Sequence, residues 1–169
     1  MTNTIQLYSL NLKDVKTYIF AALFIAGNIV LPQLCHTIHN GGFIFLPIYF
    51  FTLVGAYKYG WKVGILTALG SPLINHLLFG MPPVAVLPSI LIKSCLLALA
   101  ASYAAHKFKK VSVFLLFAVV LAYQITGCLI ESGLYGSLAQ GFQDFRLGIP
   151  GMLIQVFVGY VVIRYLFKK

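Results

Sequence analysis

The sequence contains little charge, and very little of that charge is acidic. Charged residues make up 9% of the 169 residues, whereas an average soluble domain has about 25%. The acidic residues are Asp14, Glu131 and Asp144. With so few carboxylates, the chain offers few candidates for general acid–base catalysis.

Other signatures of catalysis and metal binding are also missing. The sequence has no GxSxG, HExxH or P-loop motif, the patterns that mark common hydrolases, metalloproteases and nucleotide-hydrolysing proteins. Its cysteines, Cys35, Cys95 and Cys128, are odd in number and form no CxxC pair, which argues against a disulfide framework or a zinc ribbon. We therefore expect no enzyme activity, no cofactor and no ATP hydrolysis by the chain alone.

Hydrophobic residues dominate what is present, at 60% of the chain. A soluble fold of this size has too much surface for its volume to bury so many apolar side chains, and disorder requires low hydrophobicity. We therefore predict an all-α integral membrane protein that forms a single membrane domain over residues 1–169. Because a helix needs about 20 apolar residues to cross a bilayer, the apolar runs predict six spans, at residues 17–34, 42–58, 60–79, 84–105, 112–135 and 146–167.

The positive charges follow the predicted spans. In a six-span topology most of the twelve Lys and Arg lie on one side of the membrane: Lys13, Lys16, Lys58, Lys62, Lys107, Lys109, Lys110, Arg164, Lys168 and Lys169. Short cytoplasmic loops concentrate these residues, so both termini are predicted to be cytoplasmic. This asymmetry accounts for the net charge of +9 by the orientation of the chain in the membrane. Nucleic-acid binding is not needed to explain it. The exceptions are Arg146, on the other side, and Lys93, inside a span.

Polar residues inside the spans gather in the outer half. Lys93 lies nine residues into its span, or about 14 Å deep at 1.5 Å per residue, and either pairs with Glu131 or meets a substrate. Since a path across the membrane needs polar groups at every depth, confinement to one half favours a pocket open to the outside. The candidate binding residues are Lys93, Asn75, His76, Gln124, Glu131, Arg146 and Gln155.

The first outer loop adds Cys35, His36 and His39. Thiolate and imidazole are ligands for soft metals, so these residues are candidates to contact the metal of a bound corrinoid or haem. They do not have the spacing of a known metal site of the protein's own.

Small residues and turn motifs carry a family resemblance. Ala22 and Ala26 form a small-xxx-small face, which lets another helix approach closely. Further motifs follow in order: Gly41-Gly42, Phe45-Leu46-Pro47, the run from Gly55 to Gly64, Ser71-Pro72-Leu73 and Gly80-Met81-Pro82-Pro83. With these motifs, the chain resembles the substrate-binding S component of energy-coupling factor (ECF) vitamin transporters, best over residues 41–105.

The resemblance implies a six-helix subunit in a bacterial or archaeal cytoplasmic membrane that captures a vitamin from outside. It also implies docking, through Ala22 and Ala26, onto a transmembrane coupling subunit driven by two cytoplasmic ATPases. Many relatives carry a His directly after the Leu-Pro of the second span, whereas here Ile48-Tyr49 follows Pro47.

Three substrate and function hypotheses follow. A cobalamin- or haem-like tetrapyrrole is favoured by Cys35, His36 and His39. An acidic vitamin such as folate or pantothenate is the alternative favoured by Lys93. A membrane enzyme acting on a lipid is the alternative from another class, although no nucleophile–base pair or paired acids within a span support it.

Overall fold

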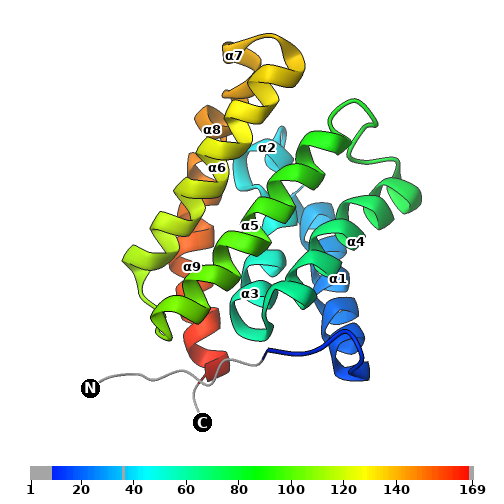
Figure 1. Cartoon of the computed structure of the whole chain (residues 1–169). Helices are drawn as coiled ribbons and strands as arrows, with labels where there is room; N and C mark the ends of the chain where they lie inside the picture. Colours follow the sequence, from blue (N-terminus) through cyan, green and yellow to red (C-terminus); the bar gives the residue numbers. More distant parts are fainter. Residues whose placement is uncertain (1–8, 36, 168–169) are drawn as a thin grey trace.

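Long helices that alternate in direction run side by side through the molecule. The computed structural model describes residues 9–35 and 37–167, and every regular element in those ranges is helical. The long helices are α1 (Val15–Cys35), α4 (Trp61–Phe79), α5 (Leu87–Phe108), α6 (Val113–Tyr135) and α9 (Ile149–Phe167). The short elements are α2 (Gly41–Phe45), the 3-10 helix η1 (Pro47–Tyr49), α3 (Phe50–Tyr59), α7 (Leu138–Gly141) and α8 (Gln143–Leu147), as drawn in Figure 1.

The outer surface of the bundle is apolar. Among the described residues, α1, α4, α5 and α6 are long and apolar enough to cross a membrane, and α9 contains a shorter apolar stretch, Ile149–Tyr165. Large apolar side chains such as Leu77, Phe114 and Tyr165 are about four-fifths exposed, at 80%, 83% and 78%. Exposed apolar surface on this scale marks a face that meets lipid or protein. The chain therefore has the pattern of a multi-pass membrane protein.

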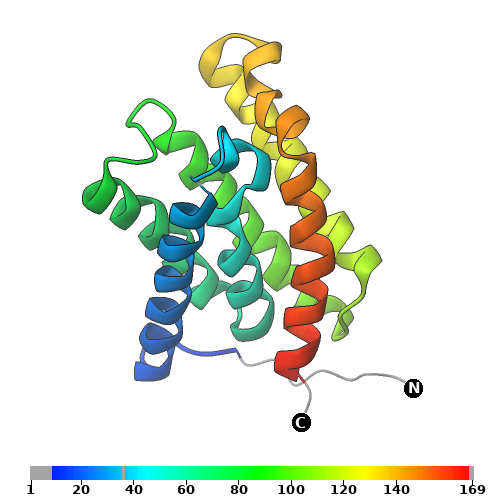
Figure 2. The same cartoon turned by 180° about the vertical axis from the view of Figure 1, so that it is seen from behind.

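The predicted span at 42–58 is not one helix. It divides into α2, η1 and α3, and the break falls at Leu46, which has a left-handed backbone with φ 47° and ψ 45°. Pro47 explains the break, because its ring disfavours the right-handed α conformation at the preceding residue and it has no N–H for a helical hydrogen bond. The prediction of a single continuous helix there was wrong, although α3 still returns the chain along the bundle (Figure 2).

The bundle has two chemically different ends. The start of α1, the α3–α4 and α5–α6 junctions and the end of α9 meet at one end (Figures 1 and 2). We call it the basic end, because its described residues include Lys13, Lys16, Lys58, Lys62, Lys107, Lys109, Lys110 and Arg164. Lys168 and Lys169 lie outside the described residues. The opposite end, which we call the loop end, carries α2, the 80–86 loop, α7 and α8.

Asn28 joins three helices inside the bundle. Its side-chain Nδ2 donates to Thr52 Oγ1 of α3 and to Ser71 Oγ of α4, both at 3.1 Å. Its Oδ1 accepts from the backbone N–H of Phe51 at 3.1 Å. A polar side chain surrounded by apolar helices is costly unless it is hydrogen-bonded, so this arrangement holds α1, α3 and α4 in one register.

Small residues of α5 face the inside of the bundle, whereas those of α1 face outward. Ala98, Ala101 and Ala105 of α5 are buried, and a Cβ at Gly64 would lie 2.5 Å from Ala56 Cβ and 3.1 Å from Ala98 Cβ. The small residues of α4 and α5 therefore permit close packing inside the bundle. By contrast, Ala22 and Ala26 of α1 are exposed on the outside of the bundle.

We predict that Asn28→Ala lowers the free energy of unfolding by about 2 kcal/mol, because each interhelical hydrogen bond in a membrane protein contributes roughly 0.6 to 2 kcal/mol. Val30→Ala on the exposed face of the same helix is the matched control, and we expect a change within about 0.5 kcal/mol. Unfolding of the purified protein in mixed micelles measures both. Equal stability of the two variants would contradict a structural role for Asn28.

Candidate ligand-binding site

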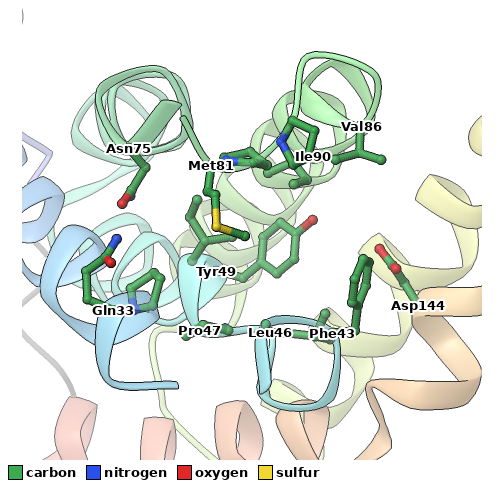
Figure 3. A pocket seen from close by; sticks show the side chains of 15 residues that line it. Gln33, Phe43, Leu46, Pro47, Tyr49, Asn75, Met81, Val86, Ile90 and Asp144 are labelled. Atoms are coloured by element: carbon green, nitrogen blue, oxygen red, sulfur yellow. The ribbon is translucent and has the colours of Figure 1, made fainter. Parts of the chain in front are cut away.

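A cavity of about 230 Å³ lies at the loop end of the bundle. Its wall is built from the end of α1, from α2 and η1, from α4, from the 81–86 segment with the start of α5, and from α8. The lining is Pro32, Gln33, Gly42, Phe43, Leu46, Pro47, Ile48, Tyr49, Asn75, Met81, Pro82, Pro83, Val86, Ile90 and Asp144 (Figure 3). A mainly apolar wall with a few polar groups is typical of a small-molecule site.

Asn75 is held in the wall by a gap in the hydrogen bonding of α1. Pro32 has no N–H, so the carbonyl oxygen of Asn28, four residues earlier, has no helical donor. Asn75 Nδ2 donates to that oxygen at 2.9 Å and also to the carbonyl oxygen of Ser71 at 3.1 Å. Both amide hydrogens are thereby used and the amide orientation is set. The Oδ1 of Asn75 has no hydrogen-bond partner, although the residue is only 2% exposed.

Tyr49 forms the centre of the lining in Figure 3, with Asn75 on one side and Asp144 on the other. It ends η1, directly after the break at Leu46 and Pro47. Its ring packs against the ring of Tyr123, with centroids 5.5 Å apart, and Tyr123 in turn donates to Gln155 Oε1 at 3.0 Å. The Tyr49 hydroxyl is buried and has no hydrogen-bond partner.

A buried charge cluster lies next to the cavity. Lys93 of α5 is 0% exposed and forms ion pairs with Glu131 of α6 and, at 3.0 Å, with Asp144 of α8. Gly127 of α6 makes room for the lysine, because a Cβ there would lie 2.5 Å from Lys93 Cγ. Lys93 and Glu131 are not part of the cavity wall, whereas Asp144 is. The cluster therefore presents a carboxylate to the cavity rather than an ammonium group.

The other predicted site residues are dispersed. His76 lies beside the cavity, where its Nδ1 donates to the carbonyl oxygen of Pro82 at 2.8 Å. Gln124 is fully buried, and neither its Nε2 nor its Oε1 has a partner. Arg146 and His39 are exposed. Of the predicted binding residues that the structure describes, Asn75 alone appears in the lining of this cavity.

Cys35 and Gln155 line a different hollow of about 250 Å³, formed with Leu31, Phe45 and Phe50 among others. His36 lies outside the described residues. Within residues 9–35 and 37–167, no group of three or more His, Cys, Asp or Glu side chains is placed to hold a metal ion. Neither Cys35, which lines this second hollow, nor the exposed His39 is part of the wall of the 230 Å³ cavity.

Sequence reasoning missed Tyr49 and Asp144 as lining residues. Asp144 lies outside the predicted spans, although its being one of only three acids in the chain was a usable signal. Tyr49 had no such signal, because its place in the wall follows from the backbone break at Leu46 and Pro47.

No family model matches the chain, and no curated protein or solved structure was found to match it. The resemblance to S components therefore depends on the motifs in the sequence, and the site has to be interpreted from its own geometry.

We predict that Lys93→Met lowers the free energy of unfolding by about 3–5 kcal/mol, because it leaves Glu131 and Asp144 close together without their shared ammonium group. Thermal unfolding in micelles measures the loss. Adding Glu131→Gln and Asp144→Asn to the variant removes both carboxylate charges, and we expect it to recover more than half of the lost stability. Lys13→Met, at an exposed lysine, is the control. A Lys93→Met protein as stable as the parent would show that the cluster is not structural.

Proposed function

We propose that the chain is the substrate-binding S component of an ECF-type importer in a bacterial or archaeal cytoplasmic membrane. In this proposal it captures a vitamin or related micronutrient from outside and delivers it to an ATPase-driven coupling module. The observation that carries the proposal is the cavity at the loop end, opposite the basic end. Since Lys and Arg concentrate on the cytoplasmic side, the basic end faces the cytoplasm and the cavity faces outward.

The proposed topology has six crossings. α1, α4, α5, α6 and α9 each make one, and α2, η1 and α3 together make the remaining one. Both chain termini then lie in the cytoplasm, in agreement with the position of α1's start and α9's end at the basic end (Figure 1). A broken second crossing is compatible with a membrane where irregular backbone lines a cavity rather than lipid, as Leu46 and Pro47 do here.

The lining favours binding over catalysis. Among the described residues, the wall of the cavity contains no Ser, Cys, His or Lys, which supply many catalytic nucleophiles and bases. Its acid–base groups are Tyr49 and Asp144, and Asp144 is already ion-paired with Lys93. Binding without chemistry is what an S component requires. This composition is our reason for preferring it over a lipid-modifying enzyme.

The size of the cavity favours a compact substrate. Its volume of about 230 Å³ is below the usual range for small-molecule sites, about 300–1,000 Å³. The tetrapyrrole hypothesis depends on Cys35, His36 and His39, of which Cys35 lines the other hollow and His39 is exposed. We therefore prefer a one- or two-ring vitamin to a cobalamin- or haem-like ligand.

The exposed face of α1 is our proposed docking surface for the transmembrane coupling subunit, which binds two cytoplasmic ATPases. Ala22 and Ala26 are one turn apart and both are exposed, so a partner helix can approach the backbone closely there. The equivalent alanines of α5 are buried and are already used by internal packing.

We predict that vesicles containing this chain together with a coupling subunit and its two ATPases accumulate a radiolabelled vitamin only when ATP is supplied. Uptake is measured against a panel of water-soluble vitamins. The chain alone should bind the same vitamin without accumulating it, since it has no means of coupling. Robust ATP-independent accumulation by the chain alone would overturn the proposal.

We also predict that Ala22→Trp with Ala26→Trp lowers ATP-driven uptake by roughly tenfold, because two indole rings hold a partner helix away from α1. Ligand affinity of the isolated chain should stay unchanged, since neither alanine lines the cavity. Val158→Trp, at a 45% exposed site on α9, is the control for added bulk. Equal uptake by the two Trp variants would place docking elsewhere.

A further inference from the structure

The charge balance at the cavity is negative. Glu131 and Asp144 supply two carboxylates to the single ammonium group of Lys93, so the buried cluster has one more negative than positive charge. Asp144 is the charged residue in the lining, and its side chain is 17% exposed. Charges interact strongly where water is scarce. An anionic ligand in the cavity would be repelled by Asp144 and could reach Lys93 only by displacing a carboxylate that already holds it.

Two polar groups without hydrogen-bond partners indicate which hydrogen-bonding groups a ligand needs. Asn75 Oδ1 is an acceptor without a donor, and its amide cannot reverse, because both hydrogens of Nδ2 are bound to backbone carbonyl oxygens. The Tyr49 hydroxyl is 1% exposed and has no partner. Buried polar atoms that lack a partner are costly. Both residues line the cavity, so a small movement of their side chains on binding lets a ligand N–H group donate to the Asn75 oxygen and lets the Tyr49 hydroxyl donate or accept.

The remaining wall is suited to a flat ring. Phe43, Met81 and the ring of Tyr49 surround the space (Figure 3), and Pro82 also lines it. Aromatic and thioether groups pack well against aromatic ligands, and aromatic faces also attract a cation.

We propose that the cavity selects a compact aromatic compound that carries N–H donors and a positive charge, such as an amidinium or an amino-substituted heteroaromatic ring. This inference rests on the proposed binding function and specifies the class of substrate. The ring lies on Tyr49 and Phe43, an N–H group donates to Asn75 Oδ1, and the positive charge lies beside Asp144. It replaces the acidic vitamins that Lys93 alone had favoured.

The test uses three probes of nearly equal shape, which are benzamidine (a cation), benzamide (neutral) and benzoate (an anion). Because such small compounds bind weakly, binding to the full chain in detergent micelles is followed by saturation-transfer NMR up to millimolar concentration. We expect benzamidine to bind roughly tenfold or more tightly than benzoate, with benzamide between them. Benzoate affinity equal to or above that of benzamidine, or no binding by any probe, overturns the inference.

Three variants locate the effect. Asp144→Asn should remove most of the benzamidine preference while benzamide affinity changes less than about threefold. Tyr49→Phe and Ser94→Ala each delete a buried hydroxyl that has no partner, so neither should destabilise the protein. Only Tyr49 lines the cavity, so only Tyr49→Phe should weaken the probes. Equal weakening by both variants, or an unchanged preference in Asp144→Asn, counts against the inference.

The two proposals fail separately. Probe binding needs only the isolated chain, whereas the importer proposal needs ATP-driven uptake with the coupling module. A cation-selective chain that never supports uptake would leave the ligand inference standing and remove the S-component proposal. ATP-driven uptake of a vitamin by a chain that prefers benzoate would do the reverse.

Discussion

The arrangement of the loop end depends on the buried ammonium group of Lys93, which needs carboxylate partners. A charge cannot remain in an apolar bundle without counter-charges, because the desolvation cost is several kcal/mol. Here two carboxylates meet it, Glu131 from the last turns of α6 and Asp144 from the short α8. Gly127 makes room for the aliphatic part of the lysine side chain, because it has no side chain of its own there. Because Asp144 must reach Lys93, α8 lies over the end of the bundle and supplies one wall of the cavity.

A second polar network orients the opposite wall. Pro32 interrupts the hydrogen bonding of α1 at Asn28, and Asn75 compensates by donating to the freed carbonyl oxygen. The same Asn28 bonds α3 and α4 through its side chain. Structural hydrogen bonds therefore use up the donors of Asn75 and leave its acceptor without a partner. The site has an intrinsic polarity, with an oxygen on one side and a carboxylate on the other.

The division of the molecule into a packed half and a hollow half follows from its residues. Near the basic end, small residues such as Gly64 and Ala98 let α4 and α5 approach closely, and Tyr57 of α3 donates to the carbonyl oxygen of Lys110 at 2.6 Å. Near the loop end, Pro32 removes a backbone hydrogen bond inside α1, and the left-handed Leu46 separates α2 from η1. The cavity is lined by residues from these two places.

Much of the fold could be predicted from the sequence, because hydrophobic run length and helix breakers act locally. Apolar runs located α1, α4, α5, α6 and α9 to within a few residues. The prediction failed at 42–58, where a hydrophobic run of sufficient length concealed the backbone break before Pro47. Composition is averaged over such a run, whereas the conformation depends on one residue pair.

The site depended on tertiary structure to a much greater degree. The sequence by itself determined that Lys93 lies in an apolar run and needs a partner, that Asn75 is a candidate binding residue, and that Ala22 and Ala26 share a helix face. Only the tertiary structure decided that Lys93 is bound by both Glu131 and Asp144, residues 38 and 51 positions away along the chain. Such pairings depend on which helices pack together and how α8 turns back. The lysine that indicated an anionic ligand is itself absent from the cavity wall, and the charged residue that lines the cavity is its partner Asp144.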